Sequence, residues 1–297
     1  CFDNIVSSES DGIQLDTPCE LTLTGSYKAE GSSGALFKIK NAGCFTIHNT
    51  ADITVSYQAI INSAGAEVIF EHNDGTLKHS TGGQLFNLKT NDKVYLKGGT
   101  INGNVFGNNN GYVEISDGVW NGSLSSVKEV KMIGGRLKNC KADTSSIYAI
   151  RGAEKISISD GEIYAKNTNT TDSNRAAYAI SMADKTQLTL SGNVDISASC
   201  DSKKQGSIYY STSGSYPTVD ATGLTLVNPG FTLAPYYAAM TSSSALTNWM
   251  ECSVDNIDSL LNNMSLNVIC PNAATQAECE KYILKAAGNY IRIVDQN

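Results

Sequence analysis

Residues 112–120 read YVEISDGVW, residues 130–137 read VKMIGGRL and residues 156–164 read ISISDGEIY, so one short phrase occurs three times. Each copy is an alternating run of apolar and polar residues, a tight Asp-Gly or Gly-Gly corner, and a second short run. Alternation with a period of two predicts strands, and a strand unit of this size cannot bury its apolar face alone. The repetition therefore predicts a solenoid of stacked rungs, each rung being one complete turn of the coil.

Three series of predicted strands extend this phrase along the chain. The first series lies at residues 36–39, 58–61, 85–88, 147–150, 177–180 and 207–210. The second lies at residues 45–47, 68–70, 94–96, 113–115, 130–132, 156–158, 188–190 and 219–221. A third strand follows a Gly-containing corner in most rungs, and the aspartates of these corners are interpreted as turn residues because Asp and Gly tolerate the backbone angles of tight corners.

The spacing of the second series varies between 17 and 32 residues, which is too uneven for a strict hexapeptide or nonapeptide repeat. Constant strands joined by turns of variable length favour a right-handed parallel β-helix. Over residues 12–235 this pattern resembles the right-handed parallel β-helix (pectate-lyase-like) superfamily of pectate lyases and polygalacturonases. The resemblance implies the fold, whereas the same coil serves as enzyme, adhesin and tailspike. We expect a non-catalytic surface or adhesin-like member, because the coil is long and regular, its surface is acidic and polar, and no set of catalytic residues is assembled in the sequence.

The expected fold class is all-β, a right-handed parallel β-helix solenoid with a small C-terminal α/β cap. Residues 1–11 are expected to form an N-terminal tether, residues 12–240 the parallel β-helix and residues 241–297 the capping module. In that module, apolar spacing predicts a helix over residues 245–264, a strand at 266–269, a helix from a capping box at Thr275 to Ala287, and a strand at 290–294. Strand, helix and strand would form a βαβ unit.

Composition restricts the classes of partner. A net charge of −7 and a pI near 5.0 argue against nucleic acid or an anionic membrane as partner, and no apolar run is long enough to span a bilayer. The eight cysteines include no Cys-x-x-Cys pair, so disulfides or buried thiols are expected and a metal site is not. Cys1 at the first position resembles the lipid-modified end of a bacterial lipoprotein, and a processing boundary is the alternative.

The enzymes of the resembling superfamily carry recognisable catalytic signatures. The Gly-His-Gly, paired-aspartate and Arg-x-Lys signatures of polygalacturonases are absent. Lyase-like chemistry would need a calcium cluster and a base. The candidates are Glu114, Asp117, Asp160 and Glu162 as acids and Lys131 or Arg136 as base. Outward charges and turn aspartates explain the same residues without chemistry. The three histidines, His48, His72 and His79, could be surface residues or part of a transition-metal site.

Tyrosines concentrate near the last predicted rungs, where they could form a platform on which sugar rings stack. These candidate binding residues are Tyr209, Tyr210, Tyr216, Tyr236 and Tyr237. Packing between rungs is the alternative. The sequence thus favours a non-enzymatic extracellular or cell-surface scaffold for adhesion, glycan binding or end-to-end self-assembly into a fibre, without a cofactor. The alternative is a calcium-dependent, polysaccharide-lyase-like enzyme.

Overall fold

The computed structural model describes residues 5–7, 12–29, 34–39, 41–56, 59–63, 66–172, 175–202, 204–211, 217–241 and 249–296. The expected lipidation site Cys1 and most of the expected tether lie outside these residues. The chain divides into two compact units, residues 1–138 and 139–297, and the boundary falls within strand β16 (Leu124–Lys141). Each unit is described by itself.

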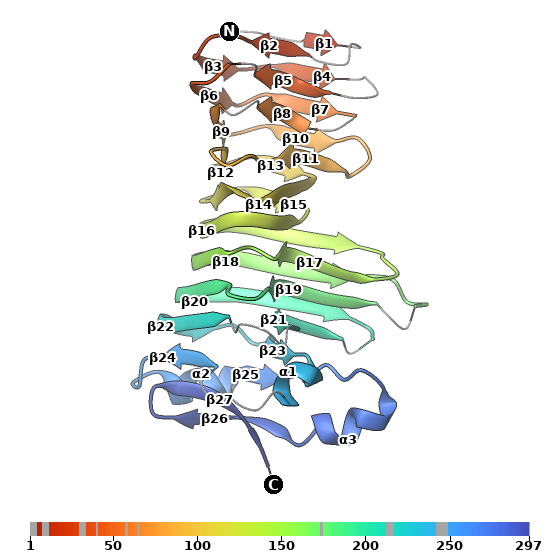
Figure 1. The fold of residues 1–297 in the computed structure, drawn as a ribbon, viewed down its shortest axis with the longest axis vertical. Coiled ribbons are helices and arrows are strands. Elements are labelled where there is room, and N and C mark those ends of the chain that lie inside the picture. The colour runs from red at the N-terminus through yellow and green to blue at the C-terminus, as the bar shows by residue number, and fades with distance from the viewer. Residues whose placement is uncertain are drawn as a thin grey trace. The chain divides into compact units, whose positions relative to one another are not determined.

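In the N-terminal unit the strands form three faces (Figure 1). The first face comprises β2 (Ile13–Leu15), β5 (Ala35–Ile39), β8 (Ala59–Ser63), β11 (Gln84–Asn87) and the first parts of β14 (Asn104–Ile115) and β16. The second comprises β3 (Glu20–Leu23), β6 (Cys44–Asn49), β9 (Glu67–His72), β12 (Lys93–Leu96) and the middle parts of β14 and β16. The third comprises β1 (Ile5–Ser7), β4 (Ser26–Ala29), β7 (Asp52–Val55), β10 (Thr76–His79), β13 (Thr100–Asn102) and β15 (Val119–Asn121).

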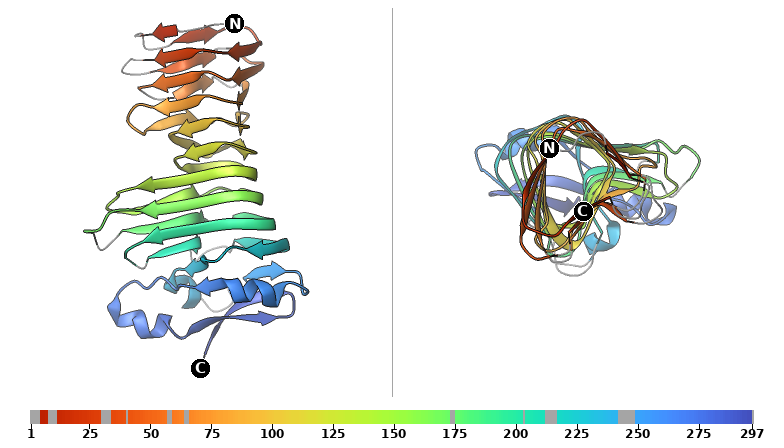
Figure 2. Two further views of the ribbon diagram at one scale, coloured as in Figure 1. Left: turned by 180° about the vertical axis from the view of Figure 1, so that it is seen from behind. Right: turned by 90° about the horizontal axis from the view of Figure 1, so that it is seen from above.

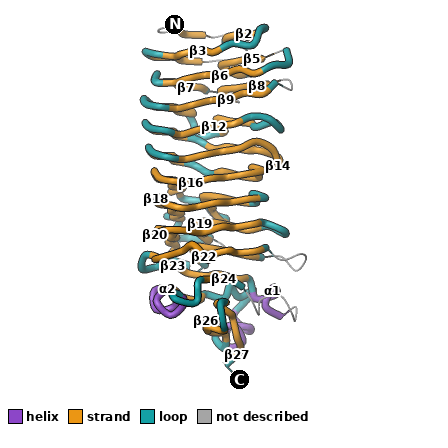
Figure 3. Tube along the Cα trace, turned by 90° about the vertical axis from the view of Figure 1, so that its left-hand side faces the viewer, coloured by secondary structure: helices purple, strands orange, loops and turns teal. Residues whose placement is uncertain are grey.

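Neighbouring strands of each face pair in parallel, and those of the second face keep one register from β6 to β16. On the second face, Phe70 lies opposite Val94, Val94 opposite Val113, and Val113 opposite Val130. All four side chains are buried, whereas the two residues that flank each of them on its own strand point outward. The tube in Figure 3 shows the strands of successive rungs separated by corners. The pairing confirms the expected parallel β-helix and the predicted strand series.

The interior of the N-terminal unit contains a short ladder of aromatic side chains. The ring centroids of Phe70 and Phe86 lie 5.4 Å apart, and those of Phe86 and Trp120 lie 6.2 Å apart. Trp120 is fully buried, and its Nε1–H donates a hydrogen bond of 3.0 Å to the carbonyl oxygen of Gly103. Burial of large aromatic side chains supplies much of the hydrophobic stabilisation of a narrow coil.

The Asp-Gly corners have the structural role expected from the sequence. The side chains of Asp74, Asp117 and Asp160 each accept a hydrogen bond of 2.7–2.8 Å from the N–H of the following glycine. Gly118 has a φ of +79°, and a Cβ there would lie 2.7 Å from the carbonyl oxygen of Gly99. Only glycine meets both requirements without strain. These aspartates are therefore turn residues.

A pair of buried polar residues lies inside the coil, at the ends of β6 and β9. Asn49 and His72 are opposite one another on β6 and β9, and both are fully buried. The Asn49 Nδ2 lies 2.8 Å from His72 Nδ1, and His72 Nε2 lies 3.2 Å from the Gly75 carbonyl oxygen. Asn49 Oδ1 accepts from the Ala51 N–H, so the amide NH₂ faces the ring. If His72 is neutral and carries its proton on Nε2, it donates that proton to the Gly75 carbonyl oxygen, and its Nδ1 accepts from the Asn49 amide.

We expect the N-terminal unit to lose stability on mild acidification because of His72. Burial lowers the pKa of His72 below its ordinary 6.5, because the charged form of the ring would lose its contact with water. A lowered folded pKa gives stability that is complete above the unfolded pKa and is lost as the pH falls through the folded pKa. Urea unfolding at pH 7.5 and 5.5 should show a smaller free energy of unfolding at pH 5.5. The variant His72→Gln should reduce this difference, and an unchanged difference would exclude His72 as its source.

The C-terminal unit has the same parallel arrangement. One face comprises β17 (Ser146–Arg151), β19 (Ala176–Met182), β21 (Gln205–Tyr210), β23 (Phe231–Pro235) and β25 (Met264–Leu266). The remaining parallel strands pair in the order β18 (Lys155–Asn167), β20 (Gln187–Cys200), β22 (Thr218–Val227) and β24 (Met250–Cys252). Strands β18 and β20 pair over two segments, one on each side of a register shift between Ile158 and Glu162. Seen from behind, Figure 2 shows both series of this unit. Strands β24 and β25 thus extend the coil by one partial rung.

The capping module differs from the prediction in its helices. Helix α1 (Tyr237–Thr241) precedes a stretch, residues 242–248, outside the described part, and α2 (Ile257–Asn263) is the described helical part of the expected helix 245–264. Residues 250–252 of that expected helix form β24 instead, because they pair with both β22 and β27 (Tyr290–Asp295). Tertiary pairing has overridden the helical spacing of the apolar residues.

The expected βαβ unit is wrong. A 3₁₀ turn (Ala273–Thr275) and a short helix α3 (Gln276–Cys279) are followed by β26 (Tyr282–Ala287), which pairs antiparallel with β27. Gly288 has a φ of +62° in the two-residue hairpin turn, so it connects strands and does not end a helix. The Thr275 side chain forms no helix cap. The final strand at 290–294 is confirmed.

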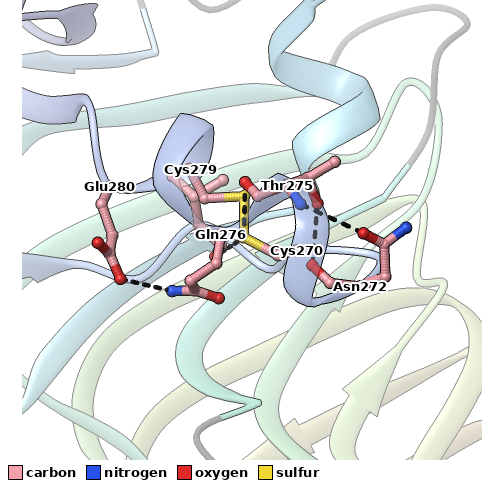
Figure 4. The surroundings of a disulfide bond; sticks show 7 residues. Cys270, Asn272, Thr275, Gln276, Cys279 and Glu280 are labelled. Carbon is pink, nitrogen blue, oxygen red and sulfur yellow. Dashed lines mark hydrogen bonds between the residues drawn. A yellow bond between two sulfur atoms is a disulfide. The ribbon is translucent and has the colours of Figure 1, made fainter.

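A disulfide joins Cys270 to Cys279 and closes the segment that contains the 3₁₀ turn and α3 (Figure 4). Within the segment, Asn272 Oδ1 accepts from the Thr275 N–H, and Gln276 donates to Glu280. The described cysteines outside this disulfide are Cys19, Cys44, Cys140, Cys200 and Cys252. Each of the two alternatives therefore holds for some of the cysteines, since Cys270 and Cys279 form a disulfide and Cys200 and Cys252 are buried thiols.

No helix among the described residues has the length and apolar character required to cross a membrane.

Candidate functional site

The five tyrosines selected from the sequence are not brought together as one platform. Tyr209 and Tyr236 are half-buried and pack against an apolar cluster of the C-terminal unit. Tyr210 is fully buried inside the coil, since adjacent residues of a strand point to opposite faces. Tyr237 begins α1, and Tyr216 lies outside the described residues.

A tyrosine stack does exist in this unit, formed by Tyr148, Tyr178 and Tyr209. Their ring centroids are 5.8 and 4.0 Å apart, with interplanar angles of 26° and 20°. The Arg151 guanidinium lies 5.0 Å from the Tyr148 ring centroid. Sugar rings bind to free aromatic faces, but here the faces cover one another and Tyr178 is only 2% exposed. The stack is therefore suited to packing between rungs.

A second tyrosine pair, on the outer side of the second face of the N-terminal unit, has a different geometry. Tyr95 on β12 and Tyr112 on β14 point outward from adjacent rungs, with ring centroids 5.7 Å apart and planes inclined by 52°. The inclined planes do not stack on one another, and the Lys97 ammonium group lies over one face of Tyr95, 5.6 Å from the ring centroid. Both side chains are half-exposed. The pair thus presents aromatic surface next to strand-borne polar groups.

The tyrosine pair borders a groove of about 410 Å³. The groove is lined by Glu67, Thr90, Asn91, Asp92, Lys93, Tyr95, Gly111, Tyr112, Lys128 and Glu129. These residues belong to β9, β12, β14 and β16 or to the turns that precede them, so the groove crosses four successive rungs. Register determines its composition, because Lys93 lies opposite Tyr112 and Tyr112 opposite Glu129.

Ion pairs hold the charged side chains of this face in defined positions. Lys93 Nζ lies 2.6 Å from Glu67 Oε1, and Lys131 Nζ lies 3.1 Å from Glu114 Oε2. The Tyr112 hydroxyl donates a hydrogen bond of 2.5 Å to the same Glu114 oxygen. Burial, together with this bond to a carboxylate, raises the pKa of Tyr112, so the phenol stays protonated. Its ring orientation is fixed through Glu114.

Asp92 is the one groove carboxylate with a raised pKa, and burial is the cause. A raised pKa in a groove is a feature of general acids, but the contacts of Asp92 are those of a turn residue. Its carboxylate accepts hydrogen bonds of 2.8 Å from the Lys89 N–H and 3.1 Å from the Ser63 hydroxyl. With 4% exposure, it holds the turn that forms one wall of the groove.

The histidines do not form a metal site. His48 points outward and bridges Glu71 at 2.8 Å and Glu20 at 3.0 Å, whereas His72 points into the coil. His79 is also buried, and its Nδ1 accepts from the Gly83 N–H. Among the described residues, no group of three or more His, Cys, Asp or Glu side chains is placed to hold a metal ion. Of the two interpretations, the surface position holds for His48 alone, because His72 and His79 are buried and hydrogen-bonded.

The residues considered for lyase-like chemistry have other roles. Glu114 and Lys131 are opposite one another, as their positions in the repeated phrase predict, and form an ion pair beside the groove. Asp117 and Asp160 are corner residues in the two units. Arg136 is exposed on the third face of the N-terminal unit, and Glu162 is half-buried on β18. Two of these six residues therefore contribute to the surroundings of the candidate site.

Sequence reasoning missed Tyr95 and Tyr112 because they are separated by 17 residues and belong to no local cluster. A signal was present, since both tyrosines occupy outward positions next to the buried Val94 and Val113. Aligning the second strand series on those valines would have placed the two rings on adjacent rungs. In a coil, residues one rung apart in sequence are neighbours in space. Tyrosines that are clustered in the sequence therefore do not identify a cluster on the surface.

Comparison with known proteins found no matching family model, no matching curated protein and no matching solved structure. The fold class therefore follows from the strand pairing within each unit. The function has to be argued from the groove.

Proposed function

We propose that this protein is a non-enzymatic glycan-binding scaffold, and that the groove beside Tyr95 and Tyr112 is its binding site. The observation that carries the proposal is the inclined tyrosine pair, which adjoins carboxylates and ammonium groups on four neighbouring rungs. Aromatic faces stack against the C–H surfaces of sugar rings, while charged groups at the side exchange hydrogen bonds with hydroxyls. The groove offers both kinds of contact on rigid strands.

Binding fits this groove better than bond cleavage does. Glycoside hydrolysis requires two carboxylates that flank the scissile bond, one of them protonated and available to the leaving oxygen. Here Glu67 is engaged by Lys93, Glu114 is engaged by Lys131 and Tyr112, and Asp92 is engaged by its own turn. These carboxylates position other groups, which is what a preorganised binding surface needs.

The proposal includes an extracellular or cell-surface location. Support comes from the Cys270–Cys279 disulfide, since such bonds persist mainly in oxidising compartments. Adhesion to a sugar-coated surface would be the corresponding biological role. A rigid coil with a polar exterior is suited to that role because it can present a binding face without unfolding.

We expect Tyr112→Ala to weaken glycan binding about two- to tenfold, because an aromatic contact is worth about 0.5–1.5 kcal/mol. The measurement is isothermal titration calorimetry against a panel of uncharged and acidic soluble polysaccharides, with analysis of the polysaccharide for cleavage products. Tyr112→Phe keeps the ring and removes only the hydroxyl that donates to Glu114. It should retain most of the affinity.

Phe106→Ala is the matched control, because Phe106 is a 40% exposed aromatic residue on the same strand, β14, and does not line the groove. This variant should bind as the unaltered protein does. Equal losses for Tyr112→Ala and Phe106→Ala would contradict the proposed site. Release of shortened sugar chains by the unaltered protein would contradict a non-enzymatic function and favour the carbohydrate-active alternative.

A further inference from the structure

The groove has a repeat of its own, set by the strands that form it. Along one outward column, Ile69, Lys93, Tyr112 and Glu129 succeed one another in register on β9, β12, β14 and β16. Neighbouring strands lie about 4.8 Å apart, so four rungs extend over roughly 14 Å. One rung is about as long as one sugar unit of an extended polysaccharide. A glycan lying across the rungs would therefore meet a new set of side chains with each unit.

The adjacent column also combines one tyrosine with charged side chains. Glu71, Tyr95, Glu114 and Lys131 lie in register beside the first column. Each aromatic residue of one column thus has a carboxylate or lysine as its neighbour along and across the rungs. Alternation of this kind offers hydrogen-bond donors and acceptors in turn, which suits sugar hydroxyls because a hydroxyl both donates and accepts.

The groove and its border carry nearly balanced charge. Outward carboxylates are supplied by Glu67, Glu114 and Glu129, and outward ammonium groups by Lys93, Lys128 and Lys131. Two of these lysines are within 3.1 Å of a carboxylate. An acidic sugar would have to compete with Glu67 for Lys93 and would be repelled by the remaining carboxylates. An uncharged sugar neither competes with Glu67 for Lys93 nor is repelled by the carboxylates.

We infer that the groove binds an uncharged, extended glycan whose chain runs across the rungs, with one sugar unit per rung and three to four units in contact. This inference rests on the proposed function and adds the ligand class and its direction. Tyr112 and Tyr95 stack against neighbouring units, and the paired charges bind hydroxyls on either side.

The test measures affinity for oligosaccharides of defined length by calorimetry. The probes are cello-, xylo- and chito-oligosaccharides of two to six units, with oligogalacturonates of the same lengths as the acidic counterpart. For at least one uncharged series, affinity should rise about tenfold from the dimer to the tetramer and then level off, which corresponds to about 1.4 kcal/mol. Oligogalacturonates should bind at least about tenfold more weakly than that series.

A second variant tests the charge argument by a gain of binding. Glu67→Gln combined with Glu129→Gln removes two outward carboxylates and leaves Lys93 and Lys128 in place. This double variant should bind oligogalacturonates about tenfold more tightly than the unaltered protein does. The control is Lys78→Ala, which removes an exposed lysine from the third face and should change neither series.

The outcomes separate the inference from the function on which it rests. If no probe and no polysaccharide of the panel binds, the proposed function and the inference are both overturned. If a glycan binds through Tyr112 but affinity does not depend on length, or if the acidic series binds more tightly, the inference is overturned and the proposed function stands. Binding with the expected length dependence and the expected charge reversal supports both.

Discussion

Trp120→Ala is expected to lower the free energy of unfolding of the N-terminal unit by about 4 kcal/mol, within the range usual for Trp-to-Ala substitutions in cores. Trp120 is fully buried on β15 and packs beside Phe86, whose ring also contacts Phe70. Alanine would leave a large cavity in an interior that is only a few side chains wide. It would also remove the donor to the Gly103 carbonyl oxygen.

The measurement is urea unfolding followed by circular dichroism, because removal of Trp120 leaves Trp249 as the only tryptophan reporter. Trp120→Phe retains part of the volume and should cost clearly less than Trp120→Ala. Phe106→Ala, at a 40% exposed position on β14, should cost less than about 1 kcal/mol. Similar losses for Trp120→Ala and Phe106→Ala would show that the aromatic ladder does not hold the rungs together.

Removal of the disulfide is expected to destabilise the capping module by about 3 kcal/mol, because the unfolded chain gains the freedom of a ten-residue loop. The double variant Cys270→Ala, Cys279→Ala removes the bond between the residue three positions before the 3₁₀ turn and the end of α3. Those elements are short and have few buried residues, since Cys279 is the one buried side chain of α3. Little else offsets the loss.

Hydrogen exchange of residues 270–287, with and without a thiol reductant, measures this effect. The reductant should raise exchange in the unaltered protein to the level of the double variant, and should change the double variant no further. Cys44→Ala controls for loss of a thiol, because Cys44 is exposed and free. Equal exchange in all four samples would mean that local packing, and not the disulfide, holds this segment.

The positions of the strands and corners of the coil could be predicted from the order of the residues alone. The alternation at residues 94–96, 113–115 and 130–132 predicted strands, and their parallel register places Val94, Val113 and Val130 in one buried column. The Asp-Gly corners were equally readable, because few residues other than glycine adopt the positive φ found at Gly118 and Gly161. Strand period and corner chemistry are local properties, so a single chain shows them.

The helices predicted for the capping module were partly wrong, because strand pairing outweighed the local helical propensity. Residues 250–252 and 282–287 lie within stretches with helical spacing or a helix-start motif, yet both are strands. Residues 250–252 pair with β22 of the coil and with β27, and residues 282–287 pair with β27. Propensity differences of a few tenths of a kcal/mol per residue cannot outweigh a row of strand hydrogen bonds and the burial that accompanies it.

The sequence by itself determined that this chain is a parallel β-helix, where most of its strands and corners lie, and that its corner aspartates serve turns. Only the tertiary structure decided which outward side chains become neighbours. Tyr95 and Tyr112 meet because β12 and β14 pair in one particular register, whereas Tyr209 and Tyr210 are neighbours in sequence and point to opposite sides of their strand. In a coil, a surface is assembled across rungs, and the distance along the chain between its members depends on the lengths of the turns.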